Sequence, residues 1–151
     1  MSIFDAHQAV FAHLRNLGIF DKVAKHEPAN VPGKGIYAAM WFDDGELQQE
    51  LSSLTAAGAQ HVVKVRMYKN ATSEPQDSID LDLIAALDGV IAALVADHTL
   101  GGSVFSVDVL GAYGDAINWA TDYVDFGQNK WYRIVDLFVP LTLEGTYSYA
   151  S

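Results

Sequence analysis

Histidine has the widest chemical repertoire of the residue types in this chain, since imidazole binds metals and moves protons near neutral pH. The chain contains five histidines, which are His7, His13, His26, His61 and His98. His7 and His13 are six residues apart in a stretch with helical periodicity, so they lie on different helix faces. No two histidines have the i, i+4 spacing of a helical zinc site. Because a metal centre needs several convergent ligands, we expect no metal site.

Three other short patterns resemble functional motifs, and each has an ordinary structural explanation. The Asp-His-Thr run at 97–99 contains the groups of a proton relay, but adjacent side chains rarely point together. Three aspartates, Asp77, Asp80 and Asp82, precede an apolar run without the glycine and terminal glutamate of a calcium loop. Negative charge is favourable in a first helical turn in any case. The Gly-Lys-Gly run at 33–35 lacks the spacing of a phosphate loop, and there is no G-x-S-x-G elbow. None of these runs is therefore a catalytic motif.

The composition of the chain excludes further classes of protein. The chain has 151 residues, half of them apolar, with a net charge of −10 and no cysteine. This length suits one domain spanning residues 1–151. The negative net charge argues against a nucleic-acid-binding protein, because binding phosphates needs clustered cations. Without cysteine there are no disulfides and no thiolate chemistry. The N-terminus lacks a signal-peptide pattern, and the most apolar run, 83–96, is too short to cross a bilayer. We expect a protein that is cytosolic where it is made.

The elements that hold these residues can be predicted from periodicity. Ser2 caps a predicted amphipathic helix over 3–17, and Gly18 ends it. Clean alternation predicts a strand over 60–69, with His61, Val63 and Val65 on one face. The other predicted elements of this half are strands at 20–26 and 36–42, a loop at 27–35, a turn at 43–45 and a loop at 70–76. Residues 46–58 fit either a polar extended arm or a short helix.

The second predicted helix, over 79–96, is apolar around almost its whole circumference. Its main stripe consists of Ile84, Leu87, Ile91 and Leu94. A second set of apolar side chains, Leu83, Ala86, Val90 and Ala93, widens this stripe. Because such a helix is buried on more than one side, we expect one side to pack on a sheet and another on a second element or subunit.

The rest of the chain has the patterns of strands and turns. We predict strands at 104–110, 117–125 and 130–141, the last two forming a long hairpin. Pro140 marks the predicted exit from the last strand, leaving 142–151 as a tail. The resulting fold class is α+β: a mostly antiparallel, mixed sheet of about four to five strands flanked by two main helices on one face.

Aromatic side chains are plentiful, and most should be core residues because strands normally bury them. Those in the hairpin and the tail are candidates for protein contacts. They include Trp119, Tyr147 and Tyr149.

The order of these elements resembles the tail terminator proteins of long-tailed, siphovirus-type bacteriophages. The resemblance covers most of the chain. It rests on the alternating strand at 60–69, the acidic-capped Ile-Asp-Leu-Asp-Leu-Ile-Ala-Ala-Leu-Asp helix from Ile79, and Thr-Leu-Gly-Gly at 99–102. It also includes the Val-Asp-Val-Leu-Gly strand end at 107–111 and the closing Trp-Tyr-Arg-Ile-Val-Asp-Leu strand at 131–137.

The resemblance implies a structural virion protein without enzyme activity or cofactor. It implies a homo-oligomer, a hexameric ring that caps the tail tube, stops its polymerisation and offers a surface for head joining. The partners would be the tail tube protein and head–tail connector proteins, with no membrane. The location would be the head-proximal end of the tail, and the host cytoplasm during assembly.

Two sets of site residues follow as hypotheses. The second half of the chain has two cations and eleven anions, against seven and eight in residues 1–75. This is either an ordinary solvated surface or a surface past which DNA slides without binding, because like charges repel within about 8–10 Å. Lumen-facing candidates are Asp108, Asp115, Asp122 and Asp125. Subunit-interface candidates are Leu83, Ala86, Val90, Ala93, Trp119, Tyr147 and Tyr149, with 43–58 and 142–151 as contacting segments.

Three alternatives remain open on the sequence alone. Another neck component, such as a head-closure or adaptor protein, would share the assembly logic but bind the portal side. A small α+β enzyme would need a deep pocket with converging perturbed groups. A regulatory domain that binds a small ligand is the third.

Overall fold

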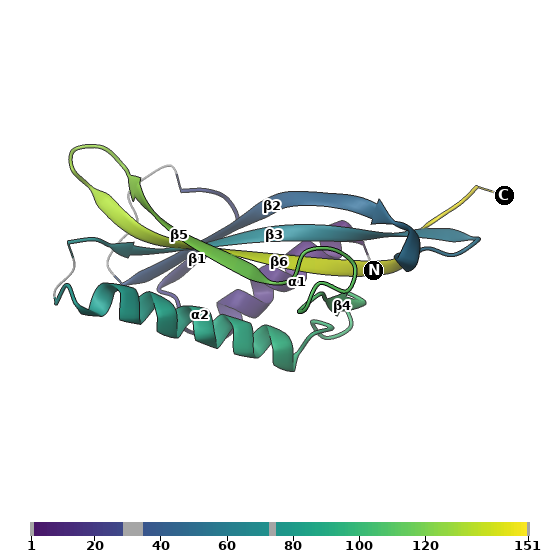
Figure 1. Ribbon diagram of the computed structural model, residues 1–151, viewed down its shortest axis with the longest axis horizontal. Coiled ribbons are helices and arrows are strands. Elements are labelled where there is room, and N and C mark those ends of the chain that lie inside the picture. The colour runs from purple at the N-terminus through teal and green to yellow at the C-terminus, as the bar shows by residue number, and fades with distance from the viewer. Residues whose placement is uncertain (1, 29–34, 73–74, 151) are drawn as a thin grey trace.

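The computed structural model describes residues 2–28, 35–72 and 75–150, and statements about absent features refer to these residues. These residues form two helices, one short 3-10 helix and six strands, which confirms the predicted α+β class (Figure 1). In chain order the elements are α1 (Ile3–Asn16), β1 (Lys22–Ala24), β2 (Ile36–Gln48), η1 (Gln49–Leu51), β3 (Ala56–Asn70), α2 (Ser78–Ala96), β4 (Ser106–Val107), β5 (Asn118–Asp125) and β6 (Trp131–Ser148).

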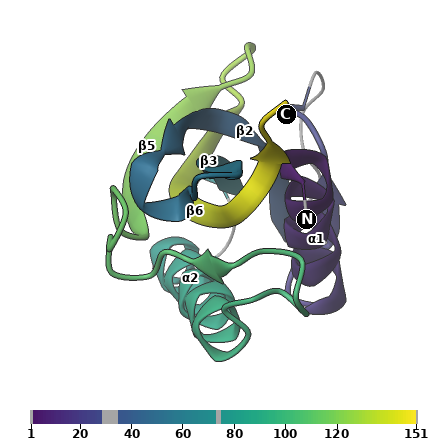
Figure 2. The ribbon, with the colours of Figure 1, turned by 90° about the vertical axis from the view of Figure 1, so that its right-hand side faces the viewer.

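All six strands belong to one sheet with the order β1-β2-β3-β6-β4, and β5 pairs with another part of β6. Only β1 and β2 are parallel, and the other pairs are antiparallel. Three strands are long: β2 has 13 residues, β3 has 15 and β6 has 18. Strands of this length twist strongly, and the sheet curls when seen from its end (Figure 2).

Both helices pack on the same face of the sheet, as predicted. The shared core contains Val10 and Leu14 of α1, Leu83 and Val90 of α2, and the β3 residues Val63, Val65 and Met67. The predicted alternation of β3 is confirmed, since His61 and these three side chains are buried together. The Ser2 cap is also present, with its hydroxyl accepting a hydrogen bond from the Asp5 amide at 3.0 Å.

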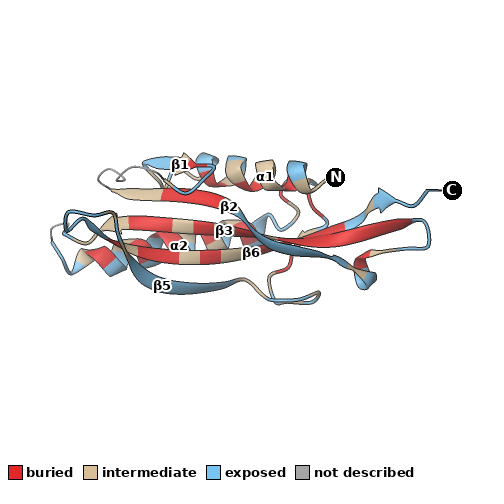
Figure 3. Ribbon diagram, turned by 90° about the horizontal axis from the view of Figure 1, so that it is seen from above, coloured by how far each residue is buried: buried red, intermediate tan, exposed pale blue. Residues whose placement is uncertain are grey.

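The opposite face of the sheet carries a smaller apolar cluster at one end. Its buried members are Ala24, Ala39, Tyr68, Tyr132 and Ile134. Tyr68 is 1% exposed, and burial raises its pKa to about 12. The remainder of this face is covered by charged and aromatic side chains. The sheet is thus half-buried on its second side (Figure 3).

The predicted turn at 43–45 is wrong, because β2 continues through it to Gln48. A register shift between Phe42 and Asp44 inserts one extra residue, which is a β-bulge. Gly45 lies so close to β3 that a Cβ there would approach the Gln60 carbonyl oxygen to 2.8 Å. The polar Asp-Asp-Gly sequence therefore encodes a bulge and a close strand approach rather than a chain reversal.

The predicted exit at Pro140 is also wrong, because β6 runs through it to Ser148 and takes in most of the expected tail. Pro140 is opposite Val62 of β3, and its carbonyl accepts a hydrogen bond from the Asp108 amide on the other side. The N–H and C=O of one strand residue point to the same side, so the missing N–H faces the gap between β5 and β4. Proline therefore breaks no bond to β3.

Two other boundaries differ from the prediction. The strand expected over 104–110 is only the two-residue β4, and the strand expected over 20–26 is the three-residue β1. Residues 46–58 form the end of β2, then η1, then the start of β3, so both expected forms occur in part. The sequence predicts loops at 27–35 and 70–76. Residues 29–34 of the first loop and 73–74 of the second lie outside the described part of the chain.

One end of the sheet extends beyond both helices (Figure 1). We call this the distal arm and define it as residues 46–59 and 143–149. Its buried side chains are those of Leu51, Leu143 and three alanines, Ala56, Ala57 and Ala59, and Leu143 also belongs to the main core. Gly58 is packed against the backbone of Leu51 and Leu143. The small residues let three strands and η1 pack closely without help from a helix.

Candidate functional site

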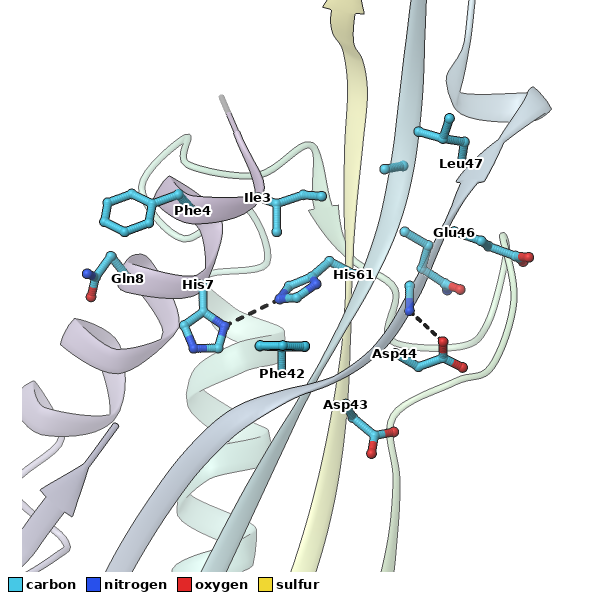
Figure 4. Close-up of a pocket in the computed structure, with 13 residues that line it drawn as sticks. Ile3, Phe4, His7, Gln8, Phe42, Asp43, Asp44, Glu46, Leu47 and His61 are labelled. Atoms are coloured by element: carbon cyan, nitrogen blue, oxygen red, sulfur yellow. Dashed lines mark hydrogen bonds between the residues drawn. The ribbon is translucent and has the colours of Figure 1, made fainter. Parts of the chain in front are cut away.

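A groove lies between the first turns of α1 and the second half of β2 (Figure 4). Its volume is about 770 Å³. Ile3, Phe4 and His7 form the helical wall, and Phe42, Leu47 and His61 are among the residues of the sheet wall. Beyond Ala39, β2 has no described strand partner on its outer side, because β1 pairs only with residues 37–39. The end of β1 therefore leaves the space that the groove occupies.

Large apolar side chains around the groove face solvent. Phe4 is 70% exposed, Phe42 is 72% exposed and Leu47 is 66% exposed. Single exposed apolar residues are common on soluble proteins, but several of them around one concavity mark a binding surface. The groove is thus suited to an apolar partner.

Two histidines meet at the base of the groove. His7 Nδ1 on α1 lies 3.3 Å from His61 Nε2 on β3 (Figure 4), so one ring donates to the other. Burial, followed by the charge of His7, lowers the pKa of His61 to about 4. Burial, followed by the charge of Lys25, lowers the pKa of His7. Both rings are therefore neutral at pH 7 and add no charge to the groove.

An acidic ridge borders the groove on the β2 side. Asp43, Asp44 and Glu46 are exposed, and Figure 4 shows their side chains pointing away from the histidine pair. Asp43 and Asp44 also line a smaller cavity of about 200 Å³ together with Asp115. None of the described cations lies within ion-pair distance of these four carboxylates. The ridge thus carries uncompensated negative charge.

The opposite face of the sheet holds the strongest ion pair. Asp136 of β6 accepts hydrogen bonds from Arg66 Nε at 2.7 Å and Arg66 Nη2 at 3.0 Å, and Lys64 Nζ lies 3.8 Å away. The hydrogen bonds from Arg66 to Asp136 raise the pKa of the guanidinium. Arg66 also stacks over Trp41 at 5.4 Å. Glu27 Oε1 lies 3.5 Å from Arg66 Nη1, so two carboxylates match the two cations and the cluster is structural rather than reactive.

The predicted lumen acids separate into two kinds. Asp108 is only 4% exposed, and its carboxylate accepts hydrogen bonds from the Ala112 amide at 2.6 Å, the Tyr113 amide at 2.9 Å and Gln60 Nε2 at 3.4 Å. It organises a loop and is too buried to line a channel. Asp115, Asp122 and Asp125 are exposed and remain available for that role.

The predicted interface residues also fall into two groups. Leu83, Ala86 and Val90 are 1%, 2% and 0% exposed inside the core of their own chain, and Ala93 is half-buried. Of the expected main stripe of α2, Ile84 is instead 51% exposed. The helix therefore turns a different apolar edge to solvent than the one we predicted.

Trp119, Tyr147 and Tyr149 are 53%, 41% and 57% exposed. The two tyrosines belong to the distal arm, where Leu54 is fully exposed and lines a second cavity with Leu47 and Tyr149. The sequence analysis did not single out Phe4 or Phe42, whereas Leu54 lies within the predicted contacting segment 43–58. Phe4 lies on the polar side of the predicted helix, and this position could have indicated an exposed contact residue. Nothing in the sequence indicates that Phe4 and Phe42 line the same groove.

The remaining motif-like residues have structural partners. Asp80 pairs with Arg133 at 3.0 Å and Asp82 pairs with Lys69 at 3.4 Å, while the Asp97 carboxylate accepts a hydrogen bond from the Gly101 amide at 3.2 Å. Within the described ranges, no group of three or more His, Cys, Asp or Glu side chains is arranged to hold a metal. In the same part of the chain, neither helix has the length and apolar character needed to cross a membrane.

Comparison with known proteins gives a likeness of fold. No protein-family model and no curated protein sequence matches the chain. A solved structure of the sheath/tube terminator of an extracellular contractile injection system in its extended state aligns with 100% of this chain and 60% of its own, at 14% identity and a TM-score of 0.50. A chain from the virion of a native gene transfer agent particle aligns with 93% of this chain and 98% of its own, at 13% identity and a TM-score of 0.40. This chain therefore spans about 60% of the length of the terminator chain, and what it shares with that terminator is the fold.

Proposed function

We propose that this chain is a terminator subunit of a phage-type tail. In this role several copies form a ring, six by resemblance to the siphovirus-type proteins. The ring caps the head-proximal end of the tail tube, stops its polymerisation and offers a surface to head–tail connector proteins. The chain acts as a structural component of the virion and assembles in the host cytoplasm.

The observation that carries this proposal is the alignment of the whole chain with a sheath/tube terminator. That likeness agrees with the order of elements from which the sequence alone suggested a tail terminator. Because fold by itself does not imply function, the proposal also rests on the side chains that the protein exposes at its surface.

The surface is that of an assembly protein. Exposed apolar side chains gather around the groove and at the distal arm, both at one end of the sheet. The groove contains a pair of neutral histidines hydrogen-bonded to each other, and no nucleophile or oriented carboxylate completes a catalytic set with them. Apolar surface without converging reactive groups supports protein docking rather than catalysis.

Charge supports passage of DNA without binding. The chain carries a net −10, and Asp115, Asp122 and Asp125 are exposed on or beside β5. Phosphate binding needs clustered cations, which this part of the chain does not have. A ring lined by such carboxylates would let DNA slide.

The test is a tube-length assay by electron microscopy. Tail tube protein from the same particle is polymerised with and without the purified chain. We expect bound density at one tube end and arrested growth when the chain is in excess. Tubes that lengthen equally in both reactions would overturn the proposal, and capture of the chain by the portal ring instead of the tube would assign it to head closure.

A further inference from the structure

We infer that the groove is the docking site for the distal arm of a second copy of this chain, with Leu54 and Tyr149 of one copy seated against Phe4 and Phe42 of the next. The inference rests on the proposed ring and names the contact that closes it. Such a contact joins two different patches, so it is heterologous, and rotation can close it into a ring.

The arm has the properties of an inserting element. Leu54 is 100% exposed at its tip and Tyr149 is 57% exposed beside it. The Tyr149 amide donates a hydrogen bond to the Thr55 carbonyl at 2.9 Å, so the two segments that carry these side chains are held together. A preformed strand end with exposed aromatic and aliphatic groups loses little freedom on docking.

Charge favours the tip of the arm over two other exposed apolar surfaces of the chain, those at Leu81 and Tyr123. The rim of the groove carries Asp43, Asp44 and Glu46, none of which has an ion-pair partner among the described residues. Exposed Leu81 on α2 lies between Asp80 and Asp82, and exposed Tyr123 on β5 follows Asp122, so both would bring like charge to the rim. The tip of the arm has no charged residue in 51–57 or 145–149, and the exposed Glu50 and Glu144 lie at its base. The tip can therefore meet an acidic rim without bringing like charge to it at Leu54 and Tyr149.

Position supports the same pairing. The first turn of α1 and the arm lie towards the same end of the long axis, whereas the tip of the β5–β6 hairpin lies at the other end (Figure 1). Leu47 lines both the groove and the arm cavity, so the apolar surface is continuous between them. Copies standing side by side around a ring therefore present arm and groove at the same level.

The absence of native cysteine makes a direct test available. Leu54→Cys and Phe42→Cys are prepared as separate single variants, mixed, and oxidised on capped tubes, so that any disulfide between these two sites joins different copies. We expect a heterodimer on a non-reducing gel and, from the double variant, a ladder that ends at the ring number. Leu110→Cys, which replaces a 90% exposed residue outside the arm, and Trp131→Cys at the hairpin tip are the matched controls.

The outcomes separate the two proposals. Capped tubes without a 54–42 disulfide, or with an equal yield from Leu110→Cys or Trp131→Cys, would overturn the arm-in-groove contact and leave the terminator role intact. A 54–42 disulfide in a protein that caps no tubes would overturn the terminator role and leave the contact intact.

Two variants of opposite charge at residue 54 test whether the acidic rim of the groove lies close to Leu54 of the neighbouring copy. Leu54→Lys and Leu54→Asp both remove the apolar side chain from a fully exposed site, so neither should affect folding. Near the acidic rim, the lysine variant should assemble about tenfold more tightly than the aspartate variant at low salt, with the difference collapsing at ~1 M salt. Equal assembly of the two variants at low salt would contradict the inference.

Discussion

Asp136 on β6 holds the guanidinium of Arg66 on β3 through two parallel hydrogen bonds, 2.7 and 3.0 Å long, directly across the strand pair. The two residues are 70 positions apart in the sequence. Both side chains are 15% exposed, so the pair is largely removed from water. It fixes the register of the two longest strands on the face away from the helices.

Asp136→Ala should therefore destabilise the fold by about 2–3 kcal/mol, because it leaves Arg66 and Lys64 as neighbouring cations without their carboxylate. The measurement is urea unfolding followed by circular dichroism. Glu27→Ala is the control, since Glu27 lies 3.5 Å from Arg66 with a side chain that is 65% exposed, and should cost less than about 0.5 kcal/mol. Equal effects of the two substitutions would contradict this account of the pair.

Asp108 is expected to stabilise the loop before β5 rather than to face a lumen. Asp108→Ala removes the acceptor of two backbone amides and of Gln60, and should cost about 2–3 kcal/mol in unfolding free energy. The exposed Asp115→Ala should change stability by less than about 0.5 kcal/mol. If Asp108→Ala left stability unchanged, these hydrogen bonds would not hold the loop.

Acid should weaken the groove through its histidine pair. The pKa of His61 is lowered to about 4 in the folded chain, whereas an unfolded histidine titrates near pH 6.5. The unfolded state therefore binds the extra proton first, and stability falls as the pH drops from about 6.5 to 4, by no more than about 1.4 kcal/mol per pH unit for one proton.

Thermal unfolding midpoints measured across this pH range test the effect. His61→Phe keeps an aromatic ring beside Phe42 and removes the titration, so its pH profile should be flatter than that of the wild type. His98→Gln replaces an exposed histidine outside the groove and serves as the control. Parallel profiles for the wild type and His61→Phe would show that this pair does not set the acid sensitivity.

Gly58 is the position where the distal arm cannot accept a side chain. A Cβ there would overlap the Leu51 and Leu143 carbonyl oxygens, which belong to the backbone and cannot rotate away. Gly58→Ala should cost about 1–3 kcal/mol and reduce ring formation. At Gly89 a Cβ would meet only the end of the flexible Ile19 side chain, so Gly89→Ala should be tolerated and serves as the control. Analytical ultracentrifugation together with urea unfolding measures both effects, and normal assembly of Gly58→Ala would contradict the role of the arm.

The two apolar edges of α2 should respond differently to truncation. Leu83→Ala leaves a cavity in the core and should cost about 2–5 kcal/mol. Ile84→Ala, at a 51% exposed site, should cost less than about 0.5 kcal/mol. Comparable losses in urea unfolding would mean that Ile84 is covered in solution.

Much of the architecture could be predicted from local pattern. Alternation along β3, the 3.6-residue period of α1 and the Ser2 cap each depend on residues within a few positions, and each is confirmed. The even apolar coverage of α2 predicts burial on more than one side, whereas the chain buries a single stripe of the helix and leaves Leu81, Ile84 and Val95 exposed. A helix that is apolar on all sides gives no preferred face, so only packing decides that Leu83 is buried and Ile84 is not.

The sequence by itself determined the α+β class, the helices, the main strands, the acidic charge and the absence of cysteine chemistry, because these follow from composition and short-range periodicity. Tertiary structure alone decided that Asp-Asp-Gly is a bulge, that Pro140 stays within β6 and that Asp108 is buried. It alone placed Phe4 and Phe42 around one groove and His7 against His61, across 38 and 54 positions of sequence. Contacts between distant segments depend on strand register and helix placement, and no local pattern of residue types encodes where the two segments meet.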